Sequence, residues 1–226
     1  MYSNNKGNYN FYGSRDYLTN GTFNFDYAVQ NQLNDHSKAI YRDGALGGWF
    51  GMAADRVGLF KYNANSASAR SDAGYDQGLK DAGTIISNLA KNSSGEIVET
   101  IKIVTHSMGG AYGKGYVRAL QKYISGLSEE EQKQIKISLI ADFDPYQAGD
   151  LSADPNIKTM QFIHKNNRNV LGMGWLANEI EKGMLGKDVF TNTGKSTDHS
   201  IFSFLGDISR LEEGTYIWDG NKWIRQ

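Results

Sequence analysis

The residue best placed for nucleophilic chemistry is a serine between a predicted strand and a predicted helix. Ser107 lies in the run THSMGG (residues 105–110), after the apolar segment Ile101–Val104 and before a predicted helix over residues 108–125. A turn of this kind exposes the serine hydroxyl at the C-terminal end of a strand, and it requires small residues two positions away. Gly109 meets this requirement, although a threonine stands where the preceding glycine is usual. The context favours Ser107 as a nucleophile over a chance serine in an ordinary turn.

Two aspartates follow the next predicted strand, Ile135–Ile140. Asp142 and Asp144 lie in the run ADFDP, at the C-terminal end of that strand. Because parallel strands end at the same edge of a sheet, a carboxylate there can reach a histidine that serves Ser107. Only one of the two can sit beside that histidine. The alternative is that an aspartate caps a turn which Pro145 makes rigid.

Alternating strand and helix patterns are predicted to position these residues. The remaining predicted elements are strands over 57–62 and 159–163, a loop over 63–71, a helix from Ser71 or Asp72 to about Leu89, a short helix opened by a Ser128–Glu131 capping box, and a helix from about His199. The alternation predicts an α/β fold with a mainly parallel sheet and flanking helices. Residues 216–224 predict a C-terminal β-hairpin around Asp219-Gly220, with two tryptophans able to face each other.

The N-terminal segment has a different character from the rest. Residues 1–45 are rich in Asn, Gly, Tyr and Asp, and only Thr22–Tyr27 alternates as a strand would. We expect an irregular layer over 1–45 that packs on a single α/β domain over 46–226.

Composition excludes several classes of function. The 226 residues carry a net charge of −1 and no cysteine, which excludes thiol catalysis, disulfides and Cys-ligated zinc and argues against a nucleic-acid binder. No phosphate loop, dinucleotide fingerprint or metal-ligand cluster is visible, so no metal and no cofactor is predicted. No membrane-spanning run and no signal peptide are visible either.

The serine motif resembles that of the α/β-hydrolase-type serine lipases and esterases. Their turn commonly reads GHSxGG, where this chain has THSMGG. The resemblance implies an α/β-hydrolase-like domain, the chain order serine, acid, histidine, and an acyl-enzyme. It also implies an oxyanion hole formed partly by the backbone N–H of Met108. The Asp144-Pro145 pair is similar to the acid of pancreatic-type lipases, which favours Asp144 over Asp142.

Four histidines compete for the role of base. They are His36, His106, His164 and His199. His106 adjoins the serine, so its side chain is expected to point elsewhere and pack. His164 ends a strand too early in the implied order, whereas His199 follows a polar loop and starts a helix. We therefore expect a Ser107–His199–Asp144 triad. The second oxyanion donor stays open between the loop over 63–69 and Gly47-Gly48.

A second resemblance concerns biological setting. The runs HSMGG, DPYQAGDL (144–151), DHSIFSF (198–204) and WDGNKW (218–223) look like C-terminal domains of Rhs-repeat polymorphic toxins. This resemblance implies an antibacterial effector domain, released from a larger protein, delivered into a competitor cell and neutralised by an immunity protein. Without such delivery, the predicted location is the cytoplasm.

The expected substrate is a lipid ester, and a phospholipid is favoured. The run LGMGWL (171–176) places apolar residues between the expected acid and base, where Trp175 can belong to a lid or to a core helix. A lipid substrate implies transient contact with a membrane surface. The alternatives are a serine amidase or acyltransferase, and a non-catalytic interaction module on a hydrolase-like fold.

Overall fold

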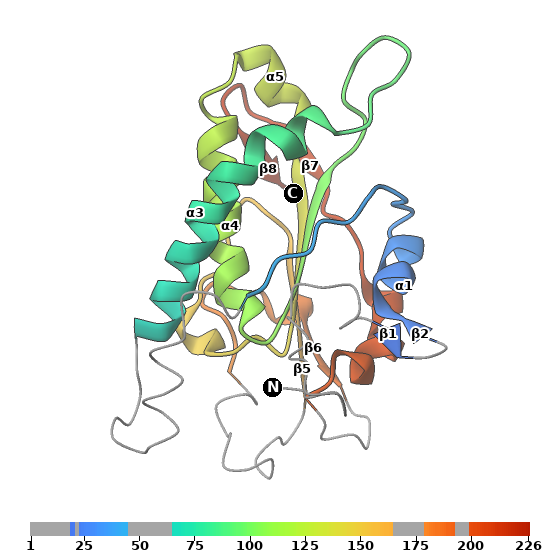
Figure 1. The fold of residues 1–226 in the computed structure, drawn as a ribbon, viewed down its shortest axis with the longest axis vertical. Helices are drawn as coiled ribbons and strands as arrows, with labels where there is room; N and C mark the ends of the chain where they lie inside the picture. The colour runs from blue at the N-terminus through green and yellow to red at the C-terminus, as the bar shows by residue number, and fades with distance from the viewer. Residues whose placement is uncertain (1–18, 21–22, 45–64, 165–178, 193–198) are drawn as a thin grey trace.

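A four-stranded parallel sheet forms the centre of the fold, as predicted (Figure 1). The computed structural model describes residues 19–20, 23–44, 65–164, 179–192 and 199–226. The sheet strands are β3 (Ile101–His106), β4 (Ile137–Phe143), β5 (Thr159–His164) and β6 (Val189–Asn192), in the order β3-β4-β5-β6. Each neighbouring pair is parallel. The predicted α/β class is therefore confirmed.

Helices cover both faces of this sheet (Figure 1). On one side, α3 (Asn65–Ser87) packs along α4 (Gly109–Ile124). On the other side, α1 (Phe25–Gln32) lies beside the 3₁₀ helix η6 (Ile201–Arg210). The smaller helices are α5 (Glu129–Gln134), η2 (Ala148–Asp150) and η5 (Gly186–Asp188).

Two apolar cores fix the sheet between these layers. One contains Phe25, Phe143, Phe162 and Phe204, so it joins α1 and η6 to strands β4 and β5. The other joins α3 and α4 to the opposite face and includes Ile137, Ile140 and Leu120. Every residue of β4 and β5 is buried, as expected for central strands covered by helices on both faces. The ends of these strands are therefore held rigidly.

Helix α1 begins inside a predicted strand, and helix α3 begins earlier in the chain than the sequence predicts. In the described part of the predicted strand Thr22–Tyr27, residues Phe23–Asn24 (β2) form a strand that pairs with β1 (Thr19–Asn20), and helix α1 follows at once. The reason is that Phe25 and Val29, four residues apart, bury one helical face in the core. Helix α3 also starts at Asn65 instead of near Ser71, because Ala67 packs against Ala111 and Leu151.

Several local predictions are confirmed, and others lie beyond what is described. Ser128 and Glu131 form the predicted capping box. The C-terminal hairpin pairs β7 (Tyr216–Trp218) with β8 (Trp223–Arg225), and its two indole rings meet edge to face at 5.6 Å. The predicted strand over 57–62 lies outside the described residues. Among the residues that are described, no helix is both long and apolar enough to cross a bilayer.

Candidate functional site

Three adjacent strands bring chemistry-bearing residues to one edge of the sheet. Ser107 directly follows β3, Asp144 directly follows β4, and His164 is the last residue of β5. The register pairs His106 with Phe143 and Phe143 with Phe162, so the three strands end together. In open α/β sheets, the C-terminal edge of the strands is where ligands bind.

The backbone is unusual at two of these positions. Ser107 has φ = 56° and Asp144 has φ = 43°, both in the left-handed region that residues other than glycine rarely adopt. Such a conformation costs about 1–3 kcal/mol and persists only where its surroundings enforce it. Backbone hydrogen bonds enforce it here: Ser107 N–H donates to Phe143 O at 3.0 Å, and Tyr146 N–H donates to Ser107 O at 2.9 Å.

A continuous hydrogen-bonded chain joins serine, histidine and aspartate. His199 Nε2 lies 2.7 Å from Ser107 Oγ, and His199 Nδ1 lies 3.1 Å from Asp144 Oδ2. The side chain of Asp144 is fully buried, and Ser107 is 6% exposed. In this arrangement the imidazole can accept the hydroxyl proton, and the carboxylate can fix the tautomer and orientation of the ring.

Asp144 is held as an anion despite its burial. Burial raises the pKa of its carboxyl group, but hydrogen bonds from His164 and His199, together with the charges of those rings, outweigh that effect. The net result is a pKa below the ordinary aspartate value. An ionised carboxylate is the form that can stabilise a positively charged His199.

The alternative acid, Asp142, lies in a separate buried cluster. Its carboxylate accepts hydrogen bonds from the Thr105 hydroxyl and from Lys114 Nζ, the latter at 2.7 Å. Lys114 also lies 2.7 Å from a carboxylate oxygen of Glu181. Burial and the negative charge of Asp142 raise the pKa of Glu181. The structure thus places Asp142 with Lys114, and Asp144 with His199.

This cluster also explains the threonine that departs from the usual serine motif. The Thr105 hydroxyl is bonded to Asp142, and its methyl group points at helix α4. A Cβ atom on Gly113 would lie only 2.6 Å from that methyl carbon. Gly113 therefore leaves the space that Thr105 needs, so the helix approaches the strand closely despite the larger residue.

His106 belongs to the site in a way that its sequence position did not suggest. Its ring stacks on that of His199, with centroids 4.8 Å apart and an interplanar angle of 30°. Burial, followed by the charge of His199, lowers the pKa of His106 to about 3. A neutral ring therefore packs against the base. The expectation that His106 packs holds, but it packs against His199.

The contact between His164 and Asp144 is not predicted from the sequence. His164 Nδ1 lies 2.5 Å from Asp144 Oδ2, on the same oxygen that His199 contacts. The signal was present, since a histidine at the end of the strand next to the acid's strand must lie near that acid. The serine–acid–histidine chain order excludes His164 as the base, but it does not exclude a contact between His164 and the acid.

The predicted oxyanion donor lies at the N-terminal end of helix α4. Met108 precedes the first residue of α4, where helix N–H groups lack an intrahelical acceptor. Gly44 packs on this turn so closely that a Cβ atom would lie 2.4 Å from Gly109 Cα. Of the second-donor candidates, residues 65–69 are helical. Gly47-Gly48, residues 63–64 and Trp175, the predicted lid residue, lie outside the described residues.

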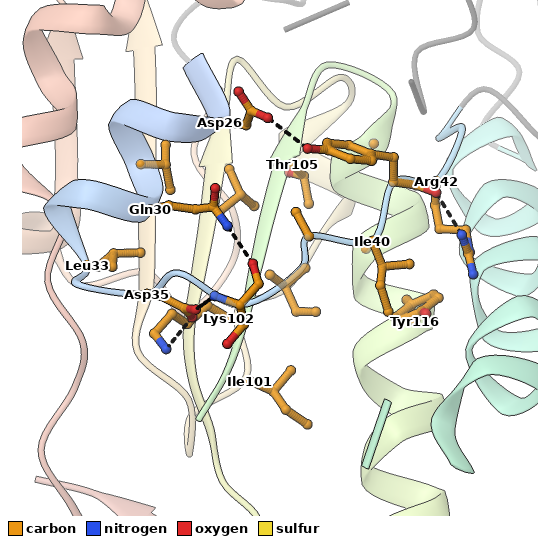
Figure 2. Close-up of a pocket in the computed structure, with 18 of the residues that line it drawn as sticks. Asp26, Gln30, Leu33, Asp35, Ile40, Arg42, Ile101, Lys102, Thr105 and Tyr116 are labelled. Atoms are coloured by element: carbon orange, nitrogen blue, oxygen red, sulfur yellow. Dashed lines mark hydrogen bonds and ion pairs between the residues drawn. The ribbon is translucent and has the colours of Figure 1, made fainter. Parts of the chain in front are cut away.

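An apolar cavity adjoins the serine turn (Figure 2). Its volume is about 350 Å³, and it extends along β3 between α1, the segment 35–44 and α4. His106, Met108 and Gly109 line it at the end nearest the turn. Most of the remaining wall is apolar and includes Val29, Ile40, Ile103, Val104 and Tyr112. Charged side chains, among them Asp26, Asp35, Arg42 and Lys102, also line the cavity. The cavity is suited to an apolar group.

Within the described residues, no group of three or more His, Asp or Glu side chains is arranged to hold a metal ion. Comparisons of the chain with protein-family models, with curated proteins and with solved structures found no match.

Proposed function

We propose that this chain is a serine hydrolase that cleaves a carboxylic ester. Ser107 is the nucleophile, His199 the general base and Asp144 the residue that orients it. The observation that carries the proposal is the unbroken Ser107–His199–Asp144 hydrogen-bond chain at the C-terminal edge of the sheet. The left-handed backbone at Ser107 adds support, because backbone strain of this kind clusters at active sites.

The fold is compatible with the resemblance to α/β-hydrolase-type lipases and esterases. The serine follows one parallel strand, the acid follows the next, and the histidine comes later in the chain. That is the chain order the resemblance implies. We propose that the chain belongs to that family.

The first half of the reaction acylates the enzyme. Ser107 Oγ attacks the ester carbonyl carbon while His199 Nε2 takes the hydroxyl proton. The tetrahedral oxyanion is stabilised by the Met108 N–H and by the positive end of α4. Collapse of the intermediate breaks the bond to the alcohol oxygen, and His199 returns its proton to that leaving group.

The second half regenerates the serine. His199 removes a proton from water, and the resulting hydroxide adds to the acyl carbonyl. The bond to Ser107 Oγ then breaks, the acid is released, and Oγ regains its proton from His199. Both half-reactions use the same two hydrogen bonds, between Ser107 and His199 and between His199 and Asp144.

The apolar cavity supports an acyl chain as the group that the site binds. Each buried methylene contributes about 0.8 kcal/mol, so a mostly apolar cavity that reaches His106 and Met108, on either side of Ser107 in the chain, favours long-chain esters over acetates. The net charge near zero offers no field that would select a strongly charged soluble ligand. A membrane-lipid ester, and a phospholipid first of all, is therefore the proposed substrate.

Filling the cavity should shorten the preferred acyl chain. Val104 lines the cavity and is 38% exposed, so Val104→Trp introduces a large ring there. Displacing about two methylenes, at about 0.8 kcal/mol each, predicts roughly a tenfold lower kcat/KM for octanoate and palmitate esters of 4-nitrophenol. Hydrolysis of the acetate ester should be unchanged.

A matched control is available on the surface. Val98 is 61% exposed and does not line this cavity, so Val98→Trp should leave the chain-length profile intact. Equal losses for acetate and octanoate in the Val104→Trp variant, or no loss for either, would remove the cavity from the acyl site. Release of fatty acid from phospholipid vesicles by the wild-type protein tests the lipid proposal directly.

Labelling with a fluorophosphonate tests the nucleophile itself. An activated serine oxygen attacks phosphorus and displaces fluoride, which leaves a stable adduct that peptide mass spectrometry can locate. We expect the adduct on Ser107 and none on Ser203, a nearby serine with a different partner. Heat-denatured protein should not react. A folded protein that remains unlabelled would favour a non-catalytic interaction module, whereas a labelled protein that cleaves only amides would favour an amidase.

A further inference from the structure

The candidate acid is shared between two histidines. Besides the contact with His199, Asp144 Oδ2 lies 2.5 Å from His164 Nδ1, and Asp144 Oδ1 accepts the backbone N–H of His164 at 3.2 Å. His164 is buried, and its ring packs against Phe204 with centroids 4.3 Å apart. A simple serine–histidine–acid chain requires no such second ring.

The other nitrogen of His164 faces a serine hydroxyl. Ser203 Oγ donates to the carbonyl oxygen of Ser200 at 2.6 Å, and a hydroxyl has only one hydrogen to give. His164 Nε2 lies 2.8 Å from the same Ser203 Oγ. With its hydrogen directed to that carbonyl, Ser203 accepts this second hydrogen bond, and His164 Nε2 is assigned as the donor.

This assignment leaves a proton to be placed between His164 and Asp144. In a neutral ring with Nε2 protonated, Nδ1 presents a lone pair, which cannot face a carboxylate oxygen at 2.5 Å. A second proton must lie between the two atoms. The carboxylate already has the His164 N–H and the His199 ring as donors, which favours its ionised form. The proton therefore belongs to the ring.

We propose that His164 is a buried imidazolium that positions Asp144 and keeps His199 in its neutral, proton-accepting form in more acidic solution than Asp144 alone would allow. His164 acts through Asp144, so it is a positioning residue. Its positive charge partly neutralises the carboxylate that would otherwise favour protonation of His199. The inference rests on the proposed function for its effect on catalysis.

The charged groups around His164 are compatible with this assignment. Asp144 follows β4, and Asp207 on η6 interacts electrostatically with His164, so two carboxylates favour its positive charge. Among the described residues, the imidazoles of His106 and His199 are further titratable groups near His164. Because His106 stays neutral, it adds no opposing charge.

Two variants separate charge from hydrogen bonding. His164→Asn keeps an N–H donor toward Asp144 without the charge. Ser203→Ala removes the acceptor at Nε2, so His164 can relax to a neutral ring that is protonated on Nδ1. Relative to activity at pH 8, each variant should retain about tenfold less kcat/KM at pH 5 than the wild type. Activity at pH 8 should fall only a few-fold. Ser209→Ala, which changes an exposed hydroxyl on the same helix, should leave the pH profile unchanged.

The protonation state can be read without any activity. Long-range proton–nitrogen correlation spectra of nitrogen-15-labelled protein should show both His164 nitrogens protonated near neutral pH, with signals assigned by their loss in His164→Asn. A single protonated nitrogen on His164, or pH profiles of both variants that match the wild type, would overturn the proposal. Ser203→Ala provides the test if His164→Asn does not fold. Absence of hydrolysis in the wild-type protein would instead refute the proposed function, and the spectra would still decide the charge of His164.

Discussion

Alanine at position 107 is expected to abolish ester hydrolysis while leaving the fold intact. Ser107 Oγ is the only atom that the proposed mechanism joins covalently to the substrate, and it lies 2.7 Å from the base. Removing such a nucleophile lowers kcat by about 10⁶-fold in comparable enzymes. Release of 4-nitrophenol from an octanoate ester measures the effect, with circular dichroism and thermal melting as checks of folding.

The same prediction extends to the base, because nucleophile and base act as one unit. His199→Ala should lose nearly as much activity as Ser107→Ala, and the double variant only slightly more. If the two losses multiply instead, the residues act independently and the shared hydrogen bond has no catalytic meaning. Full activity of a folded Ser107→Ala protein would end the proposal altogether.

The strained backbone offers a matched control at the same position. Ser107→Gly should be as inactive as Ser107→Ala but more stable, because glycine adopts φ = 56° without strain. The expected gain in the free energy of unfolding is about 1 kcal/mol. A glycine variant that melts at a higher temperature and does not hydrolyse ester separates the loss of chemistry from any loss of fold.

Asparagine at position 144 should give the second largest loss. The amide presents no charge to His199 and allows the wrong ring tautomer, a change that lowers kcat by about 10⁴-fold in serine hydrolases. Fluorophosphonate labelling of Ser107 should slow in parallel. Asp144→Asn also removes the anion that faces His164 at 2.5 Å, so thermal melting must accompany the kinetics.

Asp142→Asn is the natural comparison for this variant. Asp142 is buried as deeply as Asp144, but it faces Lys114 and Thr105, so its loss should lower stability more than turnover. The folded fraction should therefore keep activity within about tenfold of the wild type. If Asp142→Asn proves the more damaging to kcat, the role of acid belongs to Asp142; if neither variant matters, Asp144 has no catalytic role.

Sequence patterns predict strands and helices correctly where the local hydrophobic period agrees with burial in the folded protein. The alternation of elements around Ser107 and Asp144 predicted the parallel sheet because each segment has the period of its own structure. At Phe25 and Val29, burial against the sheet overrides a strand-like local pattern. The sequence does not predict strand β6, because its four residues, VFTN, are too few and too polar to show the alternating pattern of a strand.

Some features of the candidate site can be predicted from the sequence, and others depend on the fold. The spacing of Ser107, Asp144 and His199 follows from chain order and turn chemistry, which a sequence displays. The stacking of His106 on His199 and the contact of His164 with Asp144 depend on which strands are neighbours and where each one ends. Those relations exist only between segments that are far apart in the chain, so no local pattern contains them.

The ends of β3, β4 and β5 are joined mainly through main-chain atoms. Ser107 N–H and Asp144 N–H each donate to the carbonyl of a neighbouring strand, at 3.0 and 2.8 Å. These bonds involve no side chain. A mutation at position 107 or 144 therefore replaces the reactive side chain and leaves the hydrogen-bonded backbone that positions it unchanged. A lineage that carries this fold can therefore lose its reactivity through one substitution, retain the cavity and its surroundings, and regain or replace the reaction later.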